Sequence, residues 1–329
     1  MQYTELGKTG MKVSRLVLGT MNFGSRTDEK TSFAIMDRAL ELGINFFDTA
    51  NVYGAWGIGQ HSGYTEEIIG RWFAQGGGRR EKVVLATKFY NHMENELDGP
   101  NDPAGVSAYK LYRSLDASLK RLQTDHIELY QMHHIDHTIN WDEIFGAYEN
   151  MIAQGKIYYA GSSNFGARHL AFADAAAEKR HFLGLVSEQH LYNLFERLPE
   201  LELLPTAKDL GMGIIVWSPL EGGLLAENAL GATSGRRAER ASRLTDRQRK
   251  QIQDYAALCK ELGESESNVA LAWLLQNPAI TAPIVGPRTV EQLNEAVHAV
   301  DIKLSPEILA RLDEIFPGPG GSAPEAYAW

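Results

Sequence analysis

Short apolar runs and longer amphipathic stretches alternate along almost the whole chain. The apolar runs have strand length, and several, such as VVLAT and GIIVW, are continuous. Continuous apolar runs are typical of strands that are buried on both faces, as in a parallel sheet. The pattern predicts eight strands, at Arg15–Gly19, Asn45–Thr49, Val83–Lys88, Ile127–His133, Ile157–Ser163, Leu185–Gln189, Ile214–Ser218 and Pro283–Gly286.

The stretches between these strands have apolar residues at helical spacing, and several end at a glycine, as helices often do. The predicted helices are Thr31–Leu42, Thr65–Phe73, Ser107–Leu122, Trp141–Gln154, Ala167–Lys179, Pro199–Leu210, Asn268–Gln276 and Val290–Val300. Eight strand–helix alternations without a change in composition predict a closed (β/α)8 TIM barrel, as a single domain over residues 1–329.

An open, doubly wound sheet is the competing fold. That fold usually carries G-x-G-x-x-G directly after its first strand. Here the first strand is followed by GTMNFG, so the barrel is favoured.

Segments outside the repeat decorate the predicted barrel. Residues 1–14 are expected to form a hairpin across its bottom, and Leu220–Gln251 is a long loop after the seventh strand. An extra C-terminal helix precedes a tail rich in glycine, proline and alanine, Pro317–Trp329. Long loops in compact domains are usually functional or disordered.

Composition narrows the class of protein. The 329-residue chain has a net charge of −10, which argues against nucleic-acid binding. No apolar run reaches the roughly 20 residues that a membrane span needs, and the N-terminus lacks the apolar core of a signal peptide. The lone Cys259 fits a reducing compartment, so we expect a cytoplasmic protein, with homo-oligomerisation left open.

Candidate chemistry lies at the ends of the predicted strands, where barrel enzymes place their active sites. The second strand leads to Asp48 and Tyr53, the third to Lys88, and the fourth to His133. Taken singly, each has an ordinary structural explanation, such as a loop cap or turn packing. At successive strand ends they form one set of proton-handling groups.

The expected roles follow from acid–base chemistry. A free tyrosine has a pKa near 10, and a neighbouring ammonium lowers that pKa. Lys88 is therefore expected to lower the pKa of Tyr53 while Asp48 holds the lysine, and His133 is expected to orient a carbonyl oxygen. His133 and His134 should point to opposite sides of their strand. No metal ligands are expected.

These motifs resemble the aldo-keto reductases over essentially the full length of the chain, in the branch of bacterial enzymes and potassium-channel β-subunits. INFFDTANVYG resembles the Asp-plus-Tyr signature, VVLATKF the lysine motif, and IELYQMHHID the histidine motif. GSSNF, SEQHLYN, WSPLEGGLL and PIVGPRTVEQL match further motifs in the family's order. The resemblance implies that Asp48, Tyr53, Lys88 and His133 are catalytic.

The resemblance also implies a nicotinamide cofactor. Ser163, Asn164 and Gln189 are expected to hold the carboxamide, Trp217 to stack on the ring, and Arg288 to bind the 2′-phosphate of NADPH or NADP+. Ala296 replaces the asparagine that many relatives carry at an adenine contact, which leaves NADH as an alternative. The full expected set is Gly19, Thr20, Met21, Asp48, Ser163, Asn164, Gln189, Trp217, Ser218, Pro219, Leu220, Gly222, Leu224, Gly286, Arg288, Gln292 and Glu295.

The loop after Tyr53 is longer than in relatives and is expected to stand over the substrate. Candidate substrate contacts are Asn22, Trp56, Phe89, Tyr90 and His134. Their aromatic character favours a bulky, aromatic or sugar-like aldehyde or ketone, reduced to an alcohol with Tyr53 as general acid. Two other functions stay open: a redox-sensing interaction protein like the channel β-subunits, and a Schiff-base aldolase that uses Lys88.

Overall fold

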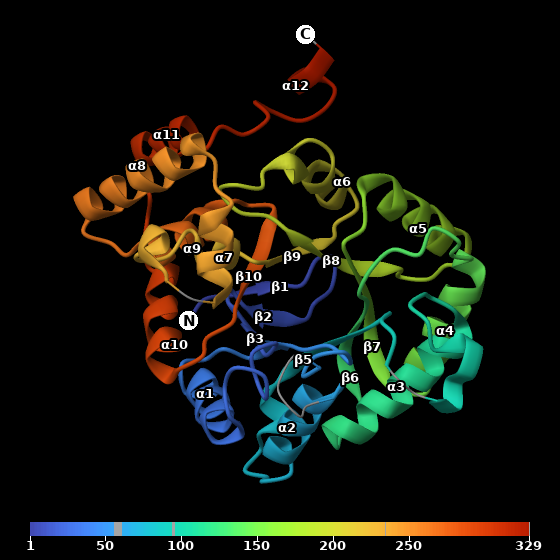
Figure 1. Cartoon of the computed structure of the whole chain (residues 1–329). Coiled ribbons are helices and arrows are strands. Elements are labelled where there is room, and N and C mark those ends of the chain that lie inside the picture. Colours follow the sequence, from blue (N-terminus) through green and yellow to red (C-terminus); the bar gives the residue numbers. More distant parts are fainter. Residues whose placement is uncertain (56–60, 94–95, 234, 329) are drawn as a thin grey trace.

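A closed barrel of parallel strands forms the centre of the molecule (Figure 1). We describe a computed structural model, which covers residues 1–55, 61–93, 96–233 and 235–328. Within these ranges eight strands close in the order β10-β3-β4-β5-β6-β7-β8-β9. They are β3 (Val17–Gly19), β4 (Phe46–Asp48), β5 (Val84–Phe89), β6 (Ile127–Met132), β7 (Ile157–Ser163), β8 (Leu185–Leu191), β9 (Gly213–Trp217) and β10 (Ile280–Val285). The predicted (β/α)8 barrel is confirmed.

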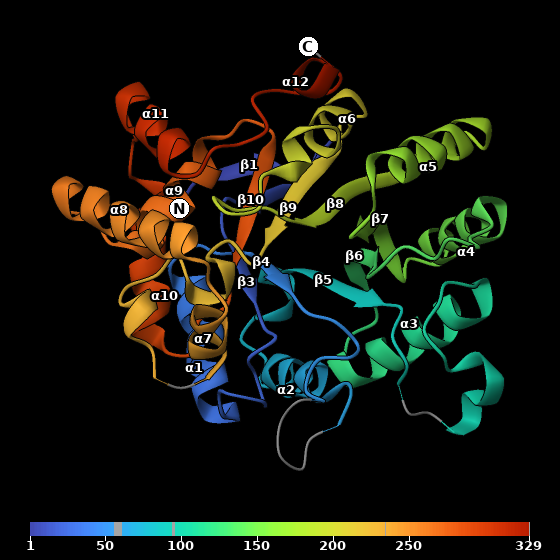
Figure 2. The same ribbon diagram turned by 45° about the horizontal axis from the view of Figure 1, so that its top comes forward.

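Helices surround the strands in sequence order, as the colours of Figure 1 show. The repeat helices are α1 (Glu29–Glu41), α2 (Tyr64–Phe73), α3 (Ala108–Leu122), α4 (Trp141–Ala153), α5 (Ala167–Lys179), α6 (Leu203–Asp209), α9 (Glu266–Gln276) and α10 (Val290–Val297). Additional helices are α7 (Gly235–Ser242), α8 (Asp246–Leu262), α11 (Pro306–Ile315) and α12 (Glu325–Ala328). The extra C-terminal helix is thus α11, and α12 lies in the tail, which projects from the body at the top of Figure 2.

Short 3-10 turns connect several of these elements. They are η1 (Arg80–Lys82), η2 (Glu96–Asn101), η3 (Leu198–Glu200), η4 (Glu221–Gly223), η5 (Ala229–Gly231) and η6 (His298–Val300). The sequence predicted one helix over Pro199–Leu210, whereas the chain forms η3 and then α6. Pro205 explains the difference, because a proline is tolerated in the first turn of a helix but not further inside it.

The predicted long loop after the seventh strand contains ordered helices, α7 and the first part of α8. The predicted boundary at Gln251 was wrong, because α8 continues to Leu262. Thr245 caps α8 by accepting a hydrogen bond from the Gln248 backbone N–H, and Gly263 ends it in the left-handed conformation.

The predicted hairpin, β1 (Tyr3–Glu5) with β2 (Lys12–Ser14), closes the bottom of the barrel. Leu6 and Val13 are fully buried there and pack with Val17 and Phe46 in the barrel interior. Because the hairpin covers the N-terminal ends of the strands, the opposite end is the one that is left for a binding site.

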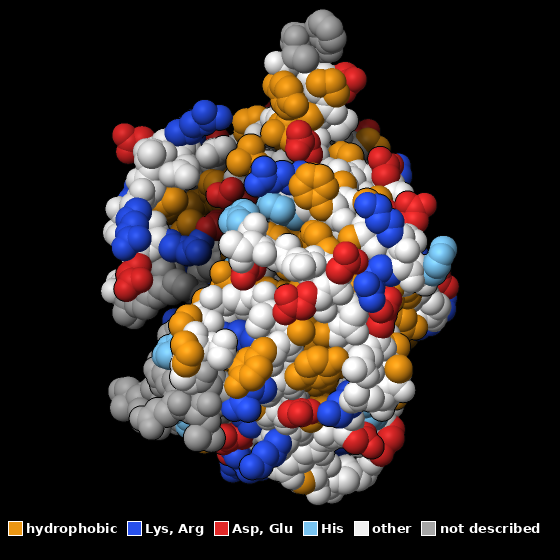
Figure 3. Space-filling model, turned by 90° about the vertical axis from the view of Figure 1, so that its right-hand side faces the viewer, with side chains coloured by type: hydrophobic (Ala, Val, Ile, Leu, Met, Phe, Trp, Pro, Cys, Tyr) orange, Lys and Arg blue, Asp and Glu red, His pale blue; other side chains and the backbone are white. Residues whose placement is uncertain are grey.

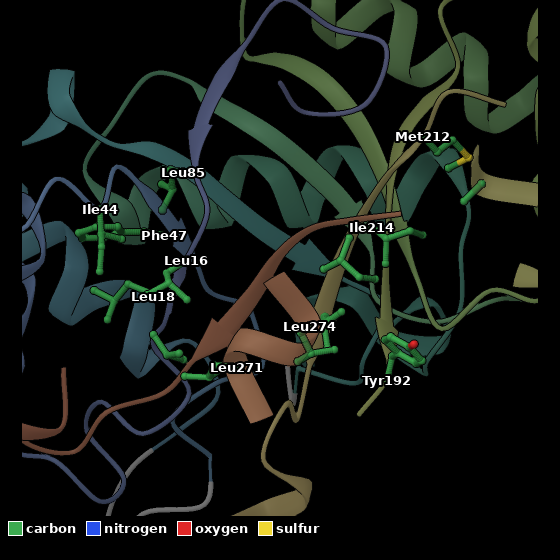
Figure 4. Close-up of a cluster of buried hydrophobic side chains, with 14 of the residues drawn as sticks. Leu16, Leu18, Ile44, Phe47, Leu85, Tyr192, Met212, Ile214, Leu271 and Leu274 are labelled. Carbon is green, nitrogen blue, oxygen red and sulfur yellow. The ribbon is translucent and has the colours of Figure 1, made fainter. Parts of the chain in front are cut away.

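A second apolar layer lies between the strands and the helices (Figure 4). The labelled side chains are Leu16, Leu18, Ile44, Phe47, Leu85, Tyr192, Met212, Ile214, Leu271 and Leu274. Side chains alternate along a strand, so Phe46 faces the barrel interior and Phe47 faces this outer layer. The same alternation turns Asp48 inward at the mouth.

Candidate active site

Lys88 is the centre of a buried polar group at the mouth of the barrel. Its Nζ donates hydrogen bonds to Asp48 Oδ1 at 2.6 Å, to the Thr49 carbonyl at 2.8 Å and to Tyr53 Oη at 3.3 Å. The Lys88 side chain has no exposed surface, and that of Asp48 is 4% exposed. Burying an ammonium is costly unless it is paired and hydrogen-bonded, and these three acceptors meet that need.

The loop after β4 brings the phenol to the lysine. The Tyr53 backbone N–H donates to Ala50, and its carbonyl accepts from the Gly63 N–H, at 3.1 Å each. Gly54 follows with φ of +108°, in the region that favours glycine. The sequence-predicted trio of Asp48, Tyr53 and Lys88 therefore comes together in space.

The environment keeps the phenol protonated and the amine charged. Burial raises the pKa of Tyr53 and outweighs the Lys88 ammonium, which acts in the opposite direction. Burial alone would lower the pKa of Lys88, but the Asp48 carboxylate and Tyr53 reverse this, so that pKa is raised. Lys88 lowers the pKa of Tyr53, as expected, but the net pKa is raised because desolvation is the larger effect.

His133 completes the set. Its ring lies edge-on to Tyr53, with the ring centroids 6.0 Å apart. Burial, the Lys88 ammonium and His134 hold the pKa of His133 well below its usual value. A neutral imidazole with one N–H therefore stands beside the phenol.

The two neighbouring histidines stack, which corrects the expectation that they point to opposite sides. The rings of His133 and His134 are 5.0 Å apart and nearly parallel, at 10°. Strand alternation does not apply here, because β6 ends at Met132. Tyr90 meets His134 edge-on at 5.2 Å, so Tyr53, His133, His134 and Tyr90 form a continuous aromatic row.

Gln131 is a site residue that the sequence analysis missed. Its Nε2 donates to Asp48 Oδ2 at 3.2 Å, and Gln189 Nε2 donates to the same oxygen at 2.8 Å. Gly161 leaves room for this amide, since a Cβ there would lie 3.1 Å from the Gln131 Cγ. A polar residue inside the apolar run IELYQM was the available signal.

Polar groups continue onto the neighbouring strand ends. Ser163 Oγ donates to the Gln189 carbonyl at 2.9 Å. The Asn164 amide donates to the His133 carbonyl at 2.9 Å and accepts from Trp217 Nε1 at 3.0 Å. The structure thus joins three predicted cofactor residues, Ser163, Asn164 and Trp217, to the proton-handling group.

The loop after β9 is tightly held. Asn193 donates to the Ser218 carbonyl at 3.0 Å and to Glu221 at 2.9 Å, and Glu221 pairs with Arg240 of α7. Gly222 has φ of +62°, and a Cβ there would lie 2.7 Å from the Arg240 guanidinium. Of the other residues predicted here, Pro219 and Leu224 are buried and Leu220 is half-buried.

The remaining predicted cofactor residues line the β3 and β10 ends. Gly19 is packed so closely that a Cβ would lie 2.5 Å from the Ile284 side chain. Thr20 is buried and donates to the Asp48 carbonyl at 2.9 Å, while Met21 is half-buried. Asn22, predicted as a substrate contact, donates to the carbonyl of Gly286, one of the predicted cofactor residues, at 2.8 Å.

The start of α10 presents a free cationic group. Arg288, Gln292 and Glu295 are exposed, and the Gln292 side chain accepts from the Arg288 backbone N–H at 2.8 Å. Within the described ranges no carboxylate pairs with the Arg288 guanidinium. Helix N-termini and arginine forks both favour phosphate groups.

Phe89 and Trp56 were both predicted to contact the substrate. Phe89 has no exposed surface and stacks on Tyr130 at 5.1 Å, in the layer beneath the helices. Its expected place in a pocket was wrong, because it follows the inward-facing Lys88 and therefore points outward. Trp56 lies outside the described residues.

The donors and rings along β7, β8, β9 and β10 fit an elongated cofactor. Amides and a hydroxyl at the ends of β7 and β8 suit a carboxamide, the flat Trp217 suits a ring, and Arg288 suits a phosphate. These strands are neighbours in the barrel, so the groups follow one side of the mouth. The fold and the site together define a (β/α)8-barrel oxidoreductase.

Comparisons with known proteins support the assignment to the oxidoreductases. The model of the aldo/keto reductase family matches residues 15–316. The chain is 61% identical to the uncharacterized oxidoreductase YrpG of Bacillus subtilis over the full length of both. It is 32% identical to a probable voltage-gated potassium channel subunit beta of Oryza sativa, covering 96% of each chain. It is 30% identical to versiconal hemiacetal acetate reductase of Aspergillus parasiticus, over 95% of this chain and 96% of that enzyme.

The chain therefore belongs to the aldo/keto reductase family.

Among the described residues, no helix is both long and apolar enough to cross a membrane. The space-filling view in Figure 3 shows basic and acidic side chains interspersed over one face of the molecule.

Proposed function

We propose that the protein reduces an aldehyde or ketone to an alcohol with NADPH, and that Tyr53 is the general acid. The observation that carries this proposal is the buried contact of Lys88 with both Asp48 and Tyr53, at 2.6 Å and 3.3 Å. A protonated phenol held against an ammonium can give its proton to an oxygen without leaving an uncompensated charge.

Each side chain has a distinct role in this reaction. The bound reduced nicotinamide supplies the hydride that reaches the carbonyl carbon. Tyr53 protonates the carbonyl oxygen, and Lys88 stabilises the phenolate that results. Asp48 keeps Lys88 charged, while the neutral His133 offers its ring N–H to the same oxygen.

NADPH rather than NADH is supported by Arg288. Its guanidinium is exposed at the start of α10 and has no ion-pair partner in the part of the chain that the structure describes. A 2′-phosphate would provide that partner, since the guanidinium donors match phosphate oxygens.

A ring-bearing carbonyl compound is supported by the aromatic row. Tyr53, His133, His134 and Tyr90 follow one another with ring centroids 6.0, 5.0 and 5.2 Å apart. Planar rings pack well against such side chains.

The alternatives are less well supported. A Schiff-base aldolase needs a lysine of depressed pKa, whereas Asp48 raises the pKa of Lys88. A redox-sensing role is favoured by the relatives named as potassium channel β-subunits. Turnover separates it from the main proposal, because a sensor binds NADPH but oxidises it slowly.

The decisive experiment compares wild type with Tyr53→Phe in an NADPH-oxidation assay across aldehydes, quinones, keto sugars and polycyclic ketones. Loss of general acid catalysis should lower kcat by about 100-fold or more, while NADPH still quenches the tryptophan fluorescence. Tyr158→Phe is the matched control, since this tyrosine is 46% exposed and lies at the start of β7, away from the mouth, and the variant should retain kcat within about threefold. Unchanged reduction by Tyr53→Phe would refute the mechanism.

A further inference from the structure

Glu188 is a buried carboxylate that the proposed reaction does not use. It is the β8 residue between Ser187 and Gln189, and strand alternation turns it away from the barrel interior, toward α5. It has no exposed surface. Within residues 1–55, 61–93, 96–233 and 235–328, no lysine or arginine pairs with it; its ionic partner is His190, at 3.0 Å.

Glu188 holds both ends of one turn. Its Oε1 accepts from the Phe165 backbone N–H at 2.9 Å, and its Oε2 accepts from Ser162 Oγ at 2.5 Å. Between these two anchors lie Ser163 and Asn164. We call residues 162–165 the β7 turn. We propose that Glu188 is a positioning residue that fixes the β7 turn for cofactor binding, an inference that rests on the proposed function.

The β7 turn includes a residue in the left-handed conformation. Asn164 has φ of +61°, a region that asparagine enters more readily than most residues with a Cβ. The same residue contacts Trp217 and the His133 carbonyl, at 3.0 Å and 2.9 Å. A shift of the β7 turn would therefore move groups on both the cofactor side and the proton side of the mouth.

Stability alone gives little reason for a carboxylate at this place. Apart from its hydrogen-bond partners, Glu188 lies beside an apolar layer in which Phe165 and Leu185 are buried. Burial raises the pKa of Glu188, which reflects the cost of its charge there. However, hydrogen bonds to a carboxylate are shorter and stronger than those to a neutral group, so a carboxylate can hold the β7 turn firmly in place.

The test measures NADPH binding by fluorescence quenching and kcat at saturating NADPH. Glu188→Leu removes both anchors and should raise the Kd for NADPH about tenfold or more, the loss expected from one or two hydrogen bonds. At saturating NADPH, kcat should fall by a smaller factor than the Kd rises. Glu188→Gln keeps an acceptor for the Phe165 N–H and should restore the Kd to within about threefold. A wild-type Kd in Glu188→Leu would overturn the proposal.

Glu66→Leu is the matched control. Glu66 is also a fully buried carboxylate, bound to Thr87 at 2.6 Å and to Arg121 at 2.8 Å, but it lies on α2 away from the β7 turn. Its loss should lower the unfolding temperature without changing the Kd. An equal rise in Kd in both variants would show general loosening and would overturn the proposal.

A second readout does not depend on the cofactor. The fluorescence of Trp217 is isolated by subtracting the spectrum of the corresponding Trp217→Phe background. In ligand-free protein it should change in Glu188→Leu, because the bond to Asn164 is lost, and should be restored in Glu188→Gln. If wild type bound no NADPH, the proposed function would fail, yet this spectrum would still decide the role of Glu188. If Glu188→Leu does not fold, Ser162→Ala provides the same test, because it removes one of the two anchors. A shifted Trp217 spectrum in Ser162→Ala would support the role of Glu188 in fixing the β7 turn, and an unshifted spectrum would overturn it.

Discussion

At the scale of single residues, burial is the largest influence on the pKa values of Tyr53 and His133, whereas the charge of Asp48 helps to raise the pKa of Lys88. The pKa of Tyr53 is raised although an ammonium touches the phenol, and the pKa of His133 is lowered. Both shifts favour the neutral form of the ring, as desolvation does in general. The phenol and the imidazole are therefore both neutral beside the charged Lys88.

The protonation states of Tyr53 and His133 determine how kcat is expected to depend on pH. Tyr53 acts as an acid only while protonated, and its raised pKa keeps it protonated up to high pH. His133 stays neutral until the pH falls well below 6.5. We expect carbonyl reduction to be flat across neutral pH and to decline only above the ordinary tyrosine pKa of about 10. A pH–rate profile at saturating NADPH checks this; an alkaline decline that begins near neutral pH would contradict it.

Gln131 gives a second prediction at this scale. Its amide is one of two donors to Asp48 Oδ2. Gln131→Leu preserves bulk but removes a hydrogen bond to a charged group, which contributes about 1.5–3 kcal/mol. We expect kcat/KM to fall about tenfold or more, with circular dichroism reporting an intact fold. Wild-type kcat/KM would show that Gln189 alone suffices.

The proximity of Asp48, Lys88 and Tyr53 could be anticipated from the sequence, because Asp48 and Lys88 lie at the ends of the buried strands β4 and β5 and Tyr53 lies in the loop after β4. Asp48, Lys88 and His133 are visible as polar residues at the ends of apolar runs. Gln131 and Glu188 were missed because they lie inside such runs, where only the partners across the barrel reveal a role. The orientation of His134 could not be predicted, because it depends on where β6 ends.

At the scale of elements, the interiors of strands and helices follow from their apolar patterns, whereas their ends depend on local backbone chemistry. The prediction began the last strand at Pro283, but β10 begins at Ile280 and carries a bulge before Ala282. Pro205 shifts the start of α6. Pro205 has no backbone N–H to donate and so cannot lie deep inside a helix, although the apolar pattern is unchanged.

The contact between α2 and α3 yields a prediction on stability. A Cβ at Gly70 of α2 would lie 2.1 Å from the Arg121 carbonyl oxygen, which is backbone and cannot move aside. Gly70→Ala should therefore lower the free energy of unfolding by about 3 kcal/mol. Urea unfolding measures this change.

Gly146 in the middle of α4 is the matched control. A Cβ there would meet only the end of the Arg180 side chain, at 3.4 Å. Gly146→Ala should raise the free energy of unfolding by about 0.5–1 kcal/mol, because alanine is the better helix former. Equal effects of the two substitutions would argue against the close approach of α2 and α3.

At the scale of the whole molecule, the two ends of the barrel separate stability from function. The hairpin fills the bottom, and the proton-handling group lies at the mouth. Leu6→Ala removes a fully buried side chain from the bottom and should cost about 2–5 kcal/mol of stability. The Kd for NADPH should not change, because the mouth is untouched.

Leu198→Ala provides the comparison. This leucine is 69% exposed, so its truncation should alter stability by no more than about 0.5 kcal/mol. Thermal unfolding and NADPH titration of both variants test the separation. A weaker Kd in Leu6→Ala at temperatures where it is fully folded would show that the two ends are coupled.

The seam of the barrel joins its first and last strands. β10 pairs with β3 through Ile284 with Val17 and Val285 with Leu18. While the ribosome makes the chain, the strands before β10 can form only an open sheet, whose edges at β3 and β9 expose backbone groups to other nascent chains. The barrel can close only after Ile280–Val285 has been synthesised, so these edges stay unpaired for most of the time that the chain is being made.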